Sequence, residues 1–322
     1  MTPYTVLIPD NVDPAALKVF EGLDAIKVIA PGNMKREETL AAIGEAHALI
    51  IRSSTTADAE LLNAAPNLKA IARAGVGVDN VDVPLATAKG VVVMNTPDGN
   101  TIATAEHTFG LMLALARHIP QGNASLKAGK WDRKSYMGVE LRGKTLGIIG
   151  FGRIGRAIAK RALAFEMTVI TTDPFIPADV TADLGVELVD LDTLYARSDF
   201  ITLHSLITDE TRGMINYDSI AKMKPGVRLI NAARGALINE PDLAEAIKSG
   251  QVAGAALDVY TEEPPAADNP LLALDNVIDT PHLAASTSDA QVAVAVDAAQ
   301  LIVDALLNNR YNNVVNPGVL QR

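Results

Sequence analysis

The chain of 322 residues contains no cysteine. Disulfide bonds, thiolate nucleophiles, cysteine-ligated zinc and iron–sulfur clusters are therefore excluded. Any chemistry has to use other side chains, and we expect no metal site.

The sequence also lacks a targeting segment, an apolar run of membrane length and an excess of positive charge. Its first residues have no basic region followed by a long apolar stretch, and the apolar run 109–116 is too short to cross a bilayer. A formal net charge of −10, with basic pairs that form no stripe, disfavours nucleic-acid binding. We therefore expect a cytoplasmic protein whose partners include neither nucleic acid nor a membrane.

Short β-rich runs alternate with helical patterns from the start of the chain. The alternation predicts βα units and a parallel sheet. A helix over 14–21 is expected after Asp13, because proline suits the first turn and aspartate caps it. The first predicted strands are 6–8, 27–29, 48–51, 70–72 and 91–93.

A long apolar helix, 101–119, and a polar loop precede a second series of strands. These begin at 145–149 and continue at 167–172, 186–189, 200–203, 227–231, 253–258 and 277–279. A helical pattern over 286–308 would return the chain to the first domain. The expected fold class is α/β, with two doubly wound parallel-sheet domains.

The segment from Gly150 to Gly155 matches the G-x-G-x-x-G pattern, which alone also occurs in tight strand–helix turns. Here it follows an apolar strand, opens a helix, and is followed by a strand that ends before Asp173. Gly150 permits the turn, Gly152 lets the backbone approach a pyrophosphate, and Gly155 allows close packing. Asp173 would accept hydrogen bonds from a ribose 2′-hydroxyl and repel a 2′-phosphate, so the loop predicts NAD rather than NADP.

Ligands of open α/β sheets bind beyond the carboxyl ends of the strands, where three polar residues are candidates for catalysis. Arg234 follows a strand, and its guanidinium could hold a substrate carboxylate. His282 follows the last strand and has the side chain best suited to proton transfer near neutral pH. Glu263 could orient the His282 ring and favour its protonated form. Considered alone, Arg234 could instead form a surface salt bridge, and His282 could be a packed or solvated loop histidine. Glu263 could lie in a solvated turn.

The remaining histidines are weaker candidates. His204 follows a strand and suits either catalysis or cofactor packing. The helical patterns around the others favour structural roles for His47, His107 and His118.

The chain resembles the D-isomer-specific 2-hydroxyacid dehydrogenase family in a series of motifs that occur in the same order. The motifs are 52–55, 73–80, 95–100 with 105–108, 129–134 with 137–138, the glycine loop, 231–235, 255–260, 263–264 and 280–287. The resemblance implies a flavodoxin-like substrate domain (1–98 and 286–322), a Rossmann NAD-binding domain (99–285), and a homodimer joined through the latter.

The resemblance also implies roles for individual residues. His282 would be the general acid, Glu263 its partner, and Arg234 the clamp on the carboxylate and the 2-oxygen. The cofactor contacts would be Gly150, Gly152, Arg153, Ile154, Gly155, Asp173, His204, Ala232, Asp258 and Val76. The substrate contacts would be Arg52, Ser53, Arg73, Gly75 and Arg133, the last reaching the partner subunit's site.

The expected reaction is NAD-dependent oxidation of D-3-phosphoglycerate to 3-phosphohydroxypyruvate, the first step of serine biosynthesis. A hydroxypyruvate or glyoxylate reductase, or another D-2-hydroxyacid dehydrogenase, is the nearest alternative. A dinucleotide-sensing corepressor is an alternative from another class. One departure from the family is alanine at Ala284, where glycine is frequent. The other is the absence of the C-terminal regulatory domains that many related enzymes carry, so we expect a natural short form or a truncated chain, without allosteric inhibition by serine.

Overall fold

The structure is a computed structural model that describes residues 2–321. It has the expected α/β class, with two sheets in which every strand pairing is parallel. The chain divides into two compact units. Unit 1 combines residues up to Asn100 with those from Ser286 onward, and unit 2 comprises Thr101–Ala285.

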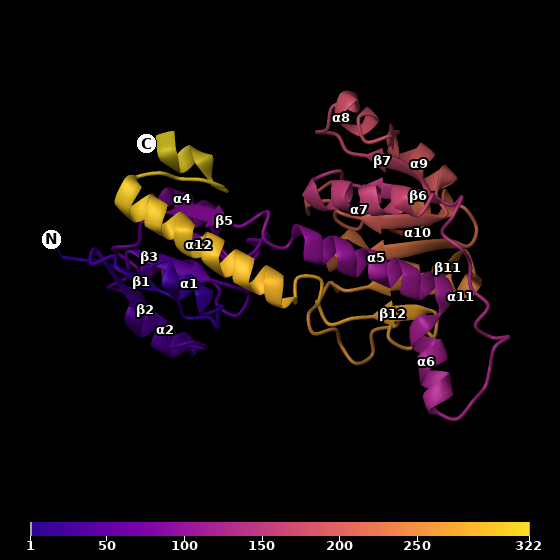
Figure 1. Cartoon of the computed structure of the whole chain (residues 1–322), viewed down its shortest axis with the longest axis horizontal. Helices are drawn as coiled ribbons and strands as arrows, with labels where there is room; N and C mark the ends of the chain where they lie inside the picture. The colour runs from indigo at the N-terminus through magenta and orange to yellow at the C-terminus, as the bar shows by residue number, and fades with distance from the viewer. Residues whose placement is uncertain (1, 322) are drawn as a thin grey trace. The chain divides into compact units, whose positions relative to one another are not determined.

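Unit 1 contains a five-stranded sheet in the order β2-β1-β3-β4-β5, which is the flavodoxin-like order (Figure 1). The strands read as continuous apolar runs because helices cover both faces of such a sheet. Helix α1 is shorter than predicted, although Asp13 does accept a hydrogen bond from the Ala15 amide at 2.9 Å. The strands are β1 (Tyr4–Leu7), β2 (Ile26–Ile29), β3 (Ala48–Ile51), β4 (Ala70–Arg73) and β5 (Val92–Asn95), and the helices are α1 (Ala15–Lys18), α2 (Arg36–Ile43), α3 (Ala59–Asn63), α4 (Val83–Ala88), α12 (Ser288–Asn308) and the 3₁₀ helix η2 (Pro317–Gln321).

Helix α12 returns the chain to unit 1 and packs along β3 and β4 (Figure 1). Its buried residues include Val294, Ala298 and Ile302, which share a cluster with Ile50 and Met94 of the sheet. By length and composition α12 could span a membrane, yet 56% of its most apolar window is buried inside the structure. Packing against the sheet accounts for this apolar character.

Unit 2 contains a seven-stranded sheet in the order β12-β11-β10-β9-β6-β7-β8. Counted from β6, this is the Rossmann order 3-2-1-4-5-6 with one further strand. Its strands are β6 (Thr145–Ile149), β7 (Thr168–Thr172), β8 (Glu187–Leu188), β9 (Phe200–Leu203), β10 (Val227–Asn231), β11 (Val252–Leu257) and β12 (Val277–Asp279), and its helices are α5 (Thr101–Arg117), α6 (Ile119–Lys127), α7 (Arg153–Ala164), α8 (Ala178–Ala182), α9 (Leu191–Arg197), α10 (Tyr217–Ala221), α11 (Glu240–Ser249) and the 3₁₀ helix η1 (Gly235–Leu237).

The carboxyl ends of six strands of this sheet are in register. Ile149 pairs with Thr172 and Leu203, and Asn231 pairs with Leu203 and Leu257. Leu257 in turn pairs with Asp279 on β12. The loops after β7, β6, β9, β10, β11 and β12 therefore leave the sheet along one edge, which we call the carboxyl edge of unit 2.

Helix α5 packs over β10, β11 and β12 of unit 2. Its residues Met112 and Leu115 share a buried cluster with Ile230, Ala256 and Ile278. The helix ends where His118 adopts a left-handed conformation with φ +51°. The expected single helix over 101–119 followed by a polar loop was wrong, because a second helix, α6, begins at Ile119, and Pro120 is tolerated in its first turn.

Candidate active site

The glycine loop connects β6 to α7 at the carboxyl edge of unit 2. Gly150 has φ +93°, and a Cβ there would lie 2.7 Å from the His204 backbone. A Cβ on Gly155 would lie 2.3 Å from the Gly150 carbonyl oxygen. A Cβ on Gly152, the N-cap of α7, would meet no atom within 4 Å. The first and third glycines thus allow the backbone segments around the loop to pack closely. Gly152 leaves room for an anion at the helix N-terminus.

Asp173 follows β7 beside this loop. Its Oδ2 accepts a hydrogen bond from the Phe151 amide at 2.7 Å, and its Oδ1 accepts one from the Phe175 amide at 2.8 Å. The carboxylate is therefore fixed against the glycine loop, where the ribose of a dinucleotide binds in this fold. Two further predicted cofactor contacts begin α7, with Arg153 exposed and Ile154 half-buried.

His204 follows β9 on the other side of the glycine loop. Its Nε2 lies 2.8 Å from Thr202 Oγ1, and burial lowers the pKa of His204 to about 3. The neutral ring is poorly suited to proton transfer near pH 7, which argues for cofactor packing over catalysis. Within residues 2–321, His204 Nδ1 and Ser205 Oγ are buried without a hydrogen-bond partner. Such atoms need a partner, so the surroundings of the glycine loop fit a dinucleotide cofactor.

Arg234 lies in the turn that follows β10. The shape of this turn depends on Asn231. The Asn231 side chain accepts a hydrogen bond from the Ala233 amide at 3.0 Å and donates one to the Arg234 carbonyl at 2.9 Å. A Cβ on Gly235 would lie 1.9 Å from the Tyr260 backbone, so glycine allows the turn to pack against the loop that carries Glu263. The Arg234 guanidinium also donates to the Ala233 carbonyl at 2.7 Å.

The structure brings His282 and Glu263 together as expected. His282 Nδ1 lies 2.7 Å from Glu263 Oε2, and Glu263 Oε1 accepts a hydrogen bond from the Tyr260 amide at 3.1 Å. The two side chains are 52% and 39% exposed, so solvent or a substrate can reach them. His282 has φ +54°, a strained conformation that is concentrated at functional sites when a residue other than glycine adopts it. With Nδ1 engaged, the ring offers Nε2 for proton transfer.

Asp258 is fully buried directly after β11, and its carboxylate binds the His282 loop. Asp258 Oδ1 accepts hydrogen bonds from the Leu283 amide at 2.7 Å and the Thr280 hydroxyl at 2.6 Å, and Oδ2 accepts one from the Ala284 amide at 2.8 Å. The Asp258 carbonyl also accepts one from the His282 amide at 2.9 Å. Its predicted contact with nicotinamide stays a prediction.

Two further residues of this cluster were not among the predicted site residues. Thr280 was quoted only as part of a motif, and His107 was assigned a structural role. His107 Nε2 lies 3.2 Å from Asp258 Oδ1 and 3.3 Å from Thr280 Oγ1. No sequence signal marks this contact, because it depends on the packing of α5 over β11 and β12. Ala284 does not have a positive φ, which explains how alanine replaces the frequent glycine there.

The predicted substrate residues of unit 1 lie at the carboxyl edge of its own sheet. Arg52 follows β3, and its amide donates to Asp10 Oδ2 at 2.5 Å. Arg73 ends β4 and pairs in register with Ile51. A Cβ on Gly75 would lie 1.4 Å from Arg73 Nη1, so glycine makes room for the guanidinium.

The other predicted contacts are more dispersed. Ser53 is exposed after Arg52, and the Val76 carbonyl accepts a hydrogen bond from the Asn95 side chain at 2.7 Å. Ala232 is 7% exposed after β10. Arg133 is exposed in the segment between α6 and β6, which belongs to unit 2.

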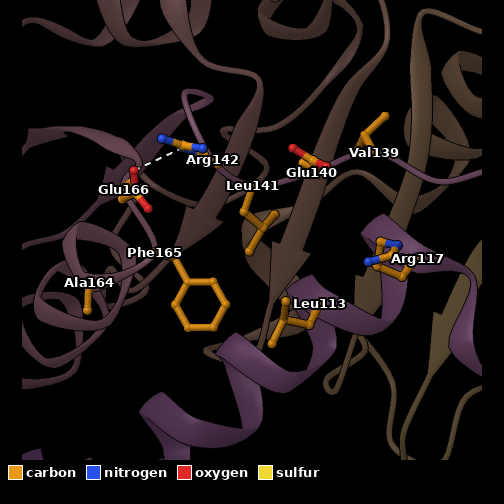
Figure 2. A pocket seen from close by; sticks show the side chains of 9 residues that line it. All are labelled: Leu113, Arg117, Val139, Glu140, Leu141, Arg142, Ala164, Phe165 and Glu166. Carbon is orange, nitrogen blue, oxygen red and sulfur yellow. Dashed lines mark ion pairs between the residues drawn. The ribbon is translucent and has the colours of Figure 1, made fainter.

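A cavity of about 360 Å³ lies away from the carboxyl edge of unit 2 (Figure 2). Its lining includes residues just before β6 and β7, at the amino ends of these strands. Leu113, Leu141 and Phe165 give it an apolar floor, and an ion pair of 2.9 Å between Arg142 and Glu166 lies at one side (Figure 2). Because it lies at the wrong end of the strands, this cavity is separate from the candidate active site.

Comparisons with known proteins agree with this geometry. Residues 109–284 match the family described as D-isomer specific 2-hydroxyacid dehydrogenase, NAD binding domain. The chain belongs to this family, and NAD is confirmed as the cofactor of unit 2.

Within the family, the D-3-phosphoglycerate dehydrogenases of Archaeoglobus fulgidus and Methanocaldococcus jannaschii are each 50% identical over 97% of this chain. The chain spans 59% of the length of these two relatives. The solved glyoxylate reductase of Paecilomyes thermophila is 31% identical, with a TM-score of 0.88. The alignment covers 98% of this chain and 99% of that chain. The D-lactate dehydrogenase of Aquifex aeolicus, solved with NAD and lactic acid, is 29% identical, with a TM-score of 0.84. The alignment covers 97% of this chain and 99% of that chain.

Proposed function

We propose that the chain catalyses the reversible NAD-dependent oxidation of D-3-phosphoglycerate to 3-phosphohydroxypyruvate, a step of serine biosynthesis. The observation that carries the reaction type is the Glu263–His282 pair on the same sheet edge as the glycine loop and Arg234. The choice of substrate rests on the 50% identity to two D-3-phosphoglycerate dehydrogenases.

The side chains can carry out this chemistry in defined roles. Arg234 would hold the substrate carboxylate, since a guanidinium binds a carboxylate through two hydrogen bonds. His282 Nε2 would take the proton of the 2-hydroxyl in oxidation and return it to the 2-oxygen in reduction. Glu263 would stabilise the protonated ring through Nδ1. Gly152, Asp173 and the other residues around the glycine loop would hold NAD, which would supply the acceptor for the hydride of the 2-carbon.

The test is NADH oxidation with a panel of 2-oxo acids. Phosphohydroxypyruvate should give a higher kcat/KM than hydroxypyruvate, glyoxylate or pyruvate. A preference for glyoxylate or hydroxypyruvate would favour the activity suggested by the likeness to a glyoxylate reductase. Binding of NADH without turnover of any 2-oxo acid would favour a dinucleotide-sensing corepressor.

Recognition of the phosphate predicts a difference between two substrates. We propose that Arg52 and Arg73 bind it, because each lies at the carboxyl end of a unit 1 strand and guanidinium groups bind phosphate oxygens in pairs. Arg52→Ala should lower kcat/KM for phosphohydroxypyruvate about tenfold or more relative to hydroxypyruvate, since a charge-assisted hydrogen bond contributes about 1.5–3 kcal/mol. The same comparison with Arg73→Ala and Arg133→Ala tests the other candidates. If kcat/KM falls equally for the two substrates in all three variants, none of these arginines recognises the phosphate.

Cofactor preference gives a second prediction. The Asp173 carboxylate is fixed beside the glycine loop, so a 2′-phosphate would face a like charge. We expect kcat/KM for NADH to exceed that for NADPH clearly, and Asp173→Ser to reduce the difference, because serine keeps a hydroxyl without the charge. Equal kcat/KM for the two cofactors in the unmodified protein would contradict the assignment.

We also propose a cytoplasmic homodimer joined through unit 2. Its segment between α5 and β6 exposes large apolar side chains, as expected of a surface that another chain covers. Equilibrium sedimentation should give twice the chain mass of 33.9 kDa, and a monomer at micromolar concentration would refute the dimer. The exposed side chains are Ile119, Leu126, Trp131 and Met137.

A further inference from the structure

His107 lies on α5 beside residues of this helix that are buried in unit 2. Its neighbours on α5, Thr108 and Phe109, belong to the interior of unit 2, and its own side chain is 24% exposed. The ring points at a carboxylate that no solvent reaches, since Asp258 is 0% exposed.

The hydrogen-bond pattern determines what His107 contributes. The Thr280 hydroxyl has one proton, and at 2.6 Å from Asp258 Oδ1 it donates that proton to the carboxylate. Both oxygen atoms near His107 Nε2 are therefore acceptors, at 3.2 Å and 3.3 Å. His107 Nε2 must carry a proton, and the ring acts as a donor to the Asp258–Thr280 pair.

Asp258 in turn fixes the loop that carries His282. The two carboxylate oxygens bind the Leu283 and Ala284 amides, and the Asp258 carbonyl binds the His282 amide. These contacts hold the backbone of His282, which is left-handed, and of the two residues that follow it. Asp258 thus holds the backbone that carries the His282 ring, while Glu263 contacts the ring itself.

We propose that His107 is a positioning residue for catalysis, which holds the Asp258 carboxylate in the orientation that supports the His282 loop. The inference rests on the proposed dehydrogenase function and adds to it a residue on α5. Hydrogen bonding from His107 is also among the causes that keep the pKa of Asp258 low against the opposite effect of burial. The carboxylate therefore stays ionised and can accept all of these hydrogen bonds.

The test compares two variants at the same position. His107→Leu keeps a similar side-chain volume and removes the donor, whereas His107→Gln can place an amide N–H near the position of Nε2. We expect His107→Leu to lower kcat about tenfold, because small displacements of a catalytic group are costly, and to leave the Kd of NADH unchanged. His107→Gln should recover most of the loss. His118→Asn is the matched control, since asparagine tolerates the left-handed backbone there, and it should leave kcat unchanged.

Hydrogen exchange gives a readout that does not depend on turnover. The peptide covering 280–286 should exchange faster in His107→Leu than in the unmodified protein or His107→Gln, because Leu283 and Ala284 donate to Asp258. Thr280→Val should give a similar change, and the double variant His107→Leu/Thr280→Val should lose less than the sum of the two losses, since both act through one carboxylate.

The outcomes separate this inference from the proposed function. If the unmodified protein reduces no 2-oxo acid, the proposed function fails, whatever the exchange data show. If it is active and His107→Leu keeps both kcat and slow exchange over 280–286, the positioning role of His107 is overturned. Equal losses in the Leu and Gln variants would also overturn it, because they would trace the effect to packing.

Discussion

Replacing His282 by asparagine should lower kcat about 10²–10⁴-fold for reduction of a 2-oxo acid, the range that general acid catalysis contributes. Asparagine tolerates the left-handed backbone at this position and can still donate a hydrogen bond toward Glu263, so the loop should keep its shape. What is lost is the group that transfers the proton. Binding of NADH depends on the glycine loop and should be unchanged within a factor of about two.

Kinetics and cofactor binding must be measured on the same preparation. kcat comes from initial rates of NADH oxidation, and the Kd of NADH comes from fluorescence titration. A kcat within a factor of about three of the unmodified enzyme would remove His282 from the chemistry, because general acid catalysis contributes far more. A companion variant, Glu263→Gln, keeps a hydrogen-bonding group at 2.7 Å and removes the charge. It should lower kcat with less effect than His282→Asn, because the ring keeps a hydrogen-bond partner and loses only the charge beside it.

Ligands of open parallel sheets bind beyond the carboxyl ends of the strands, and for this reason much of the site could be predicted from the sequence. Arg234, Glu263 and His282 were selected because each follows an apolar strand, and the register of β10, β11 and β12 does place these loops along one edge. The glycine loop was recognisable because its neighbouring elements are local in sequence. The order of the strands in both sheets also agrees with the α/β folds expected from alternating βα units.

Contacts between distant segments were the part that sequence could not supply. Helix α5 brings His107 to Asp258 across 151 positions of sequence, and nothing in the local pattern around His107 distinguishes it from a packed helical histidine. The contacts that Asp258 makes with the His282 loop could not be predicted for the same reason. Its four donors come from α5, the end of β12 and the His282 loop, and only the folded chain shows that they converge on one carboxylate.

Asp258→Asn should combine loss of activity with loss of stability. Asparagine presents one acceptor oxygen and an NH₂ group, so at least one of the Leu283 and Ala284 amides would face another donor. A buried donor without a partner costs about 1–3 kcal/mol, and we expect the free energy of unfolding to fall by about 2–4 kcal/mol. With the His282 loop released, kcat should fall about 10²-fold or more, since misplacement by about 1 Å can have this effect.

The pH dependence of this stability difference identifies the charge as its source. Burial alone would raise the pKa of Asp258, but hydrogen bonds from His107, Thr280 and the two loop amides outweigh it and lower the pKa below its ordinary value. A carboxyl group whose pKa is lower in the folded state stabilises the fold above its unfolded pKa of about 3.9, and this contribution is lost as the pH falls through the folded value. Urea unfolding of the unmodified protein and of Asp258→Asn should therefore show a constant difference between about pH 5 and pH 8 that narrows below about pH 4. A difference that is already small at neutral pH, or that grows as the pH falls, would mean that the ionised carboxylate does not hold the His282 loop.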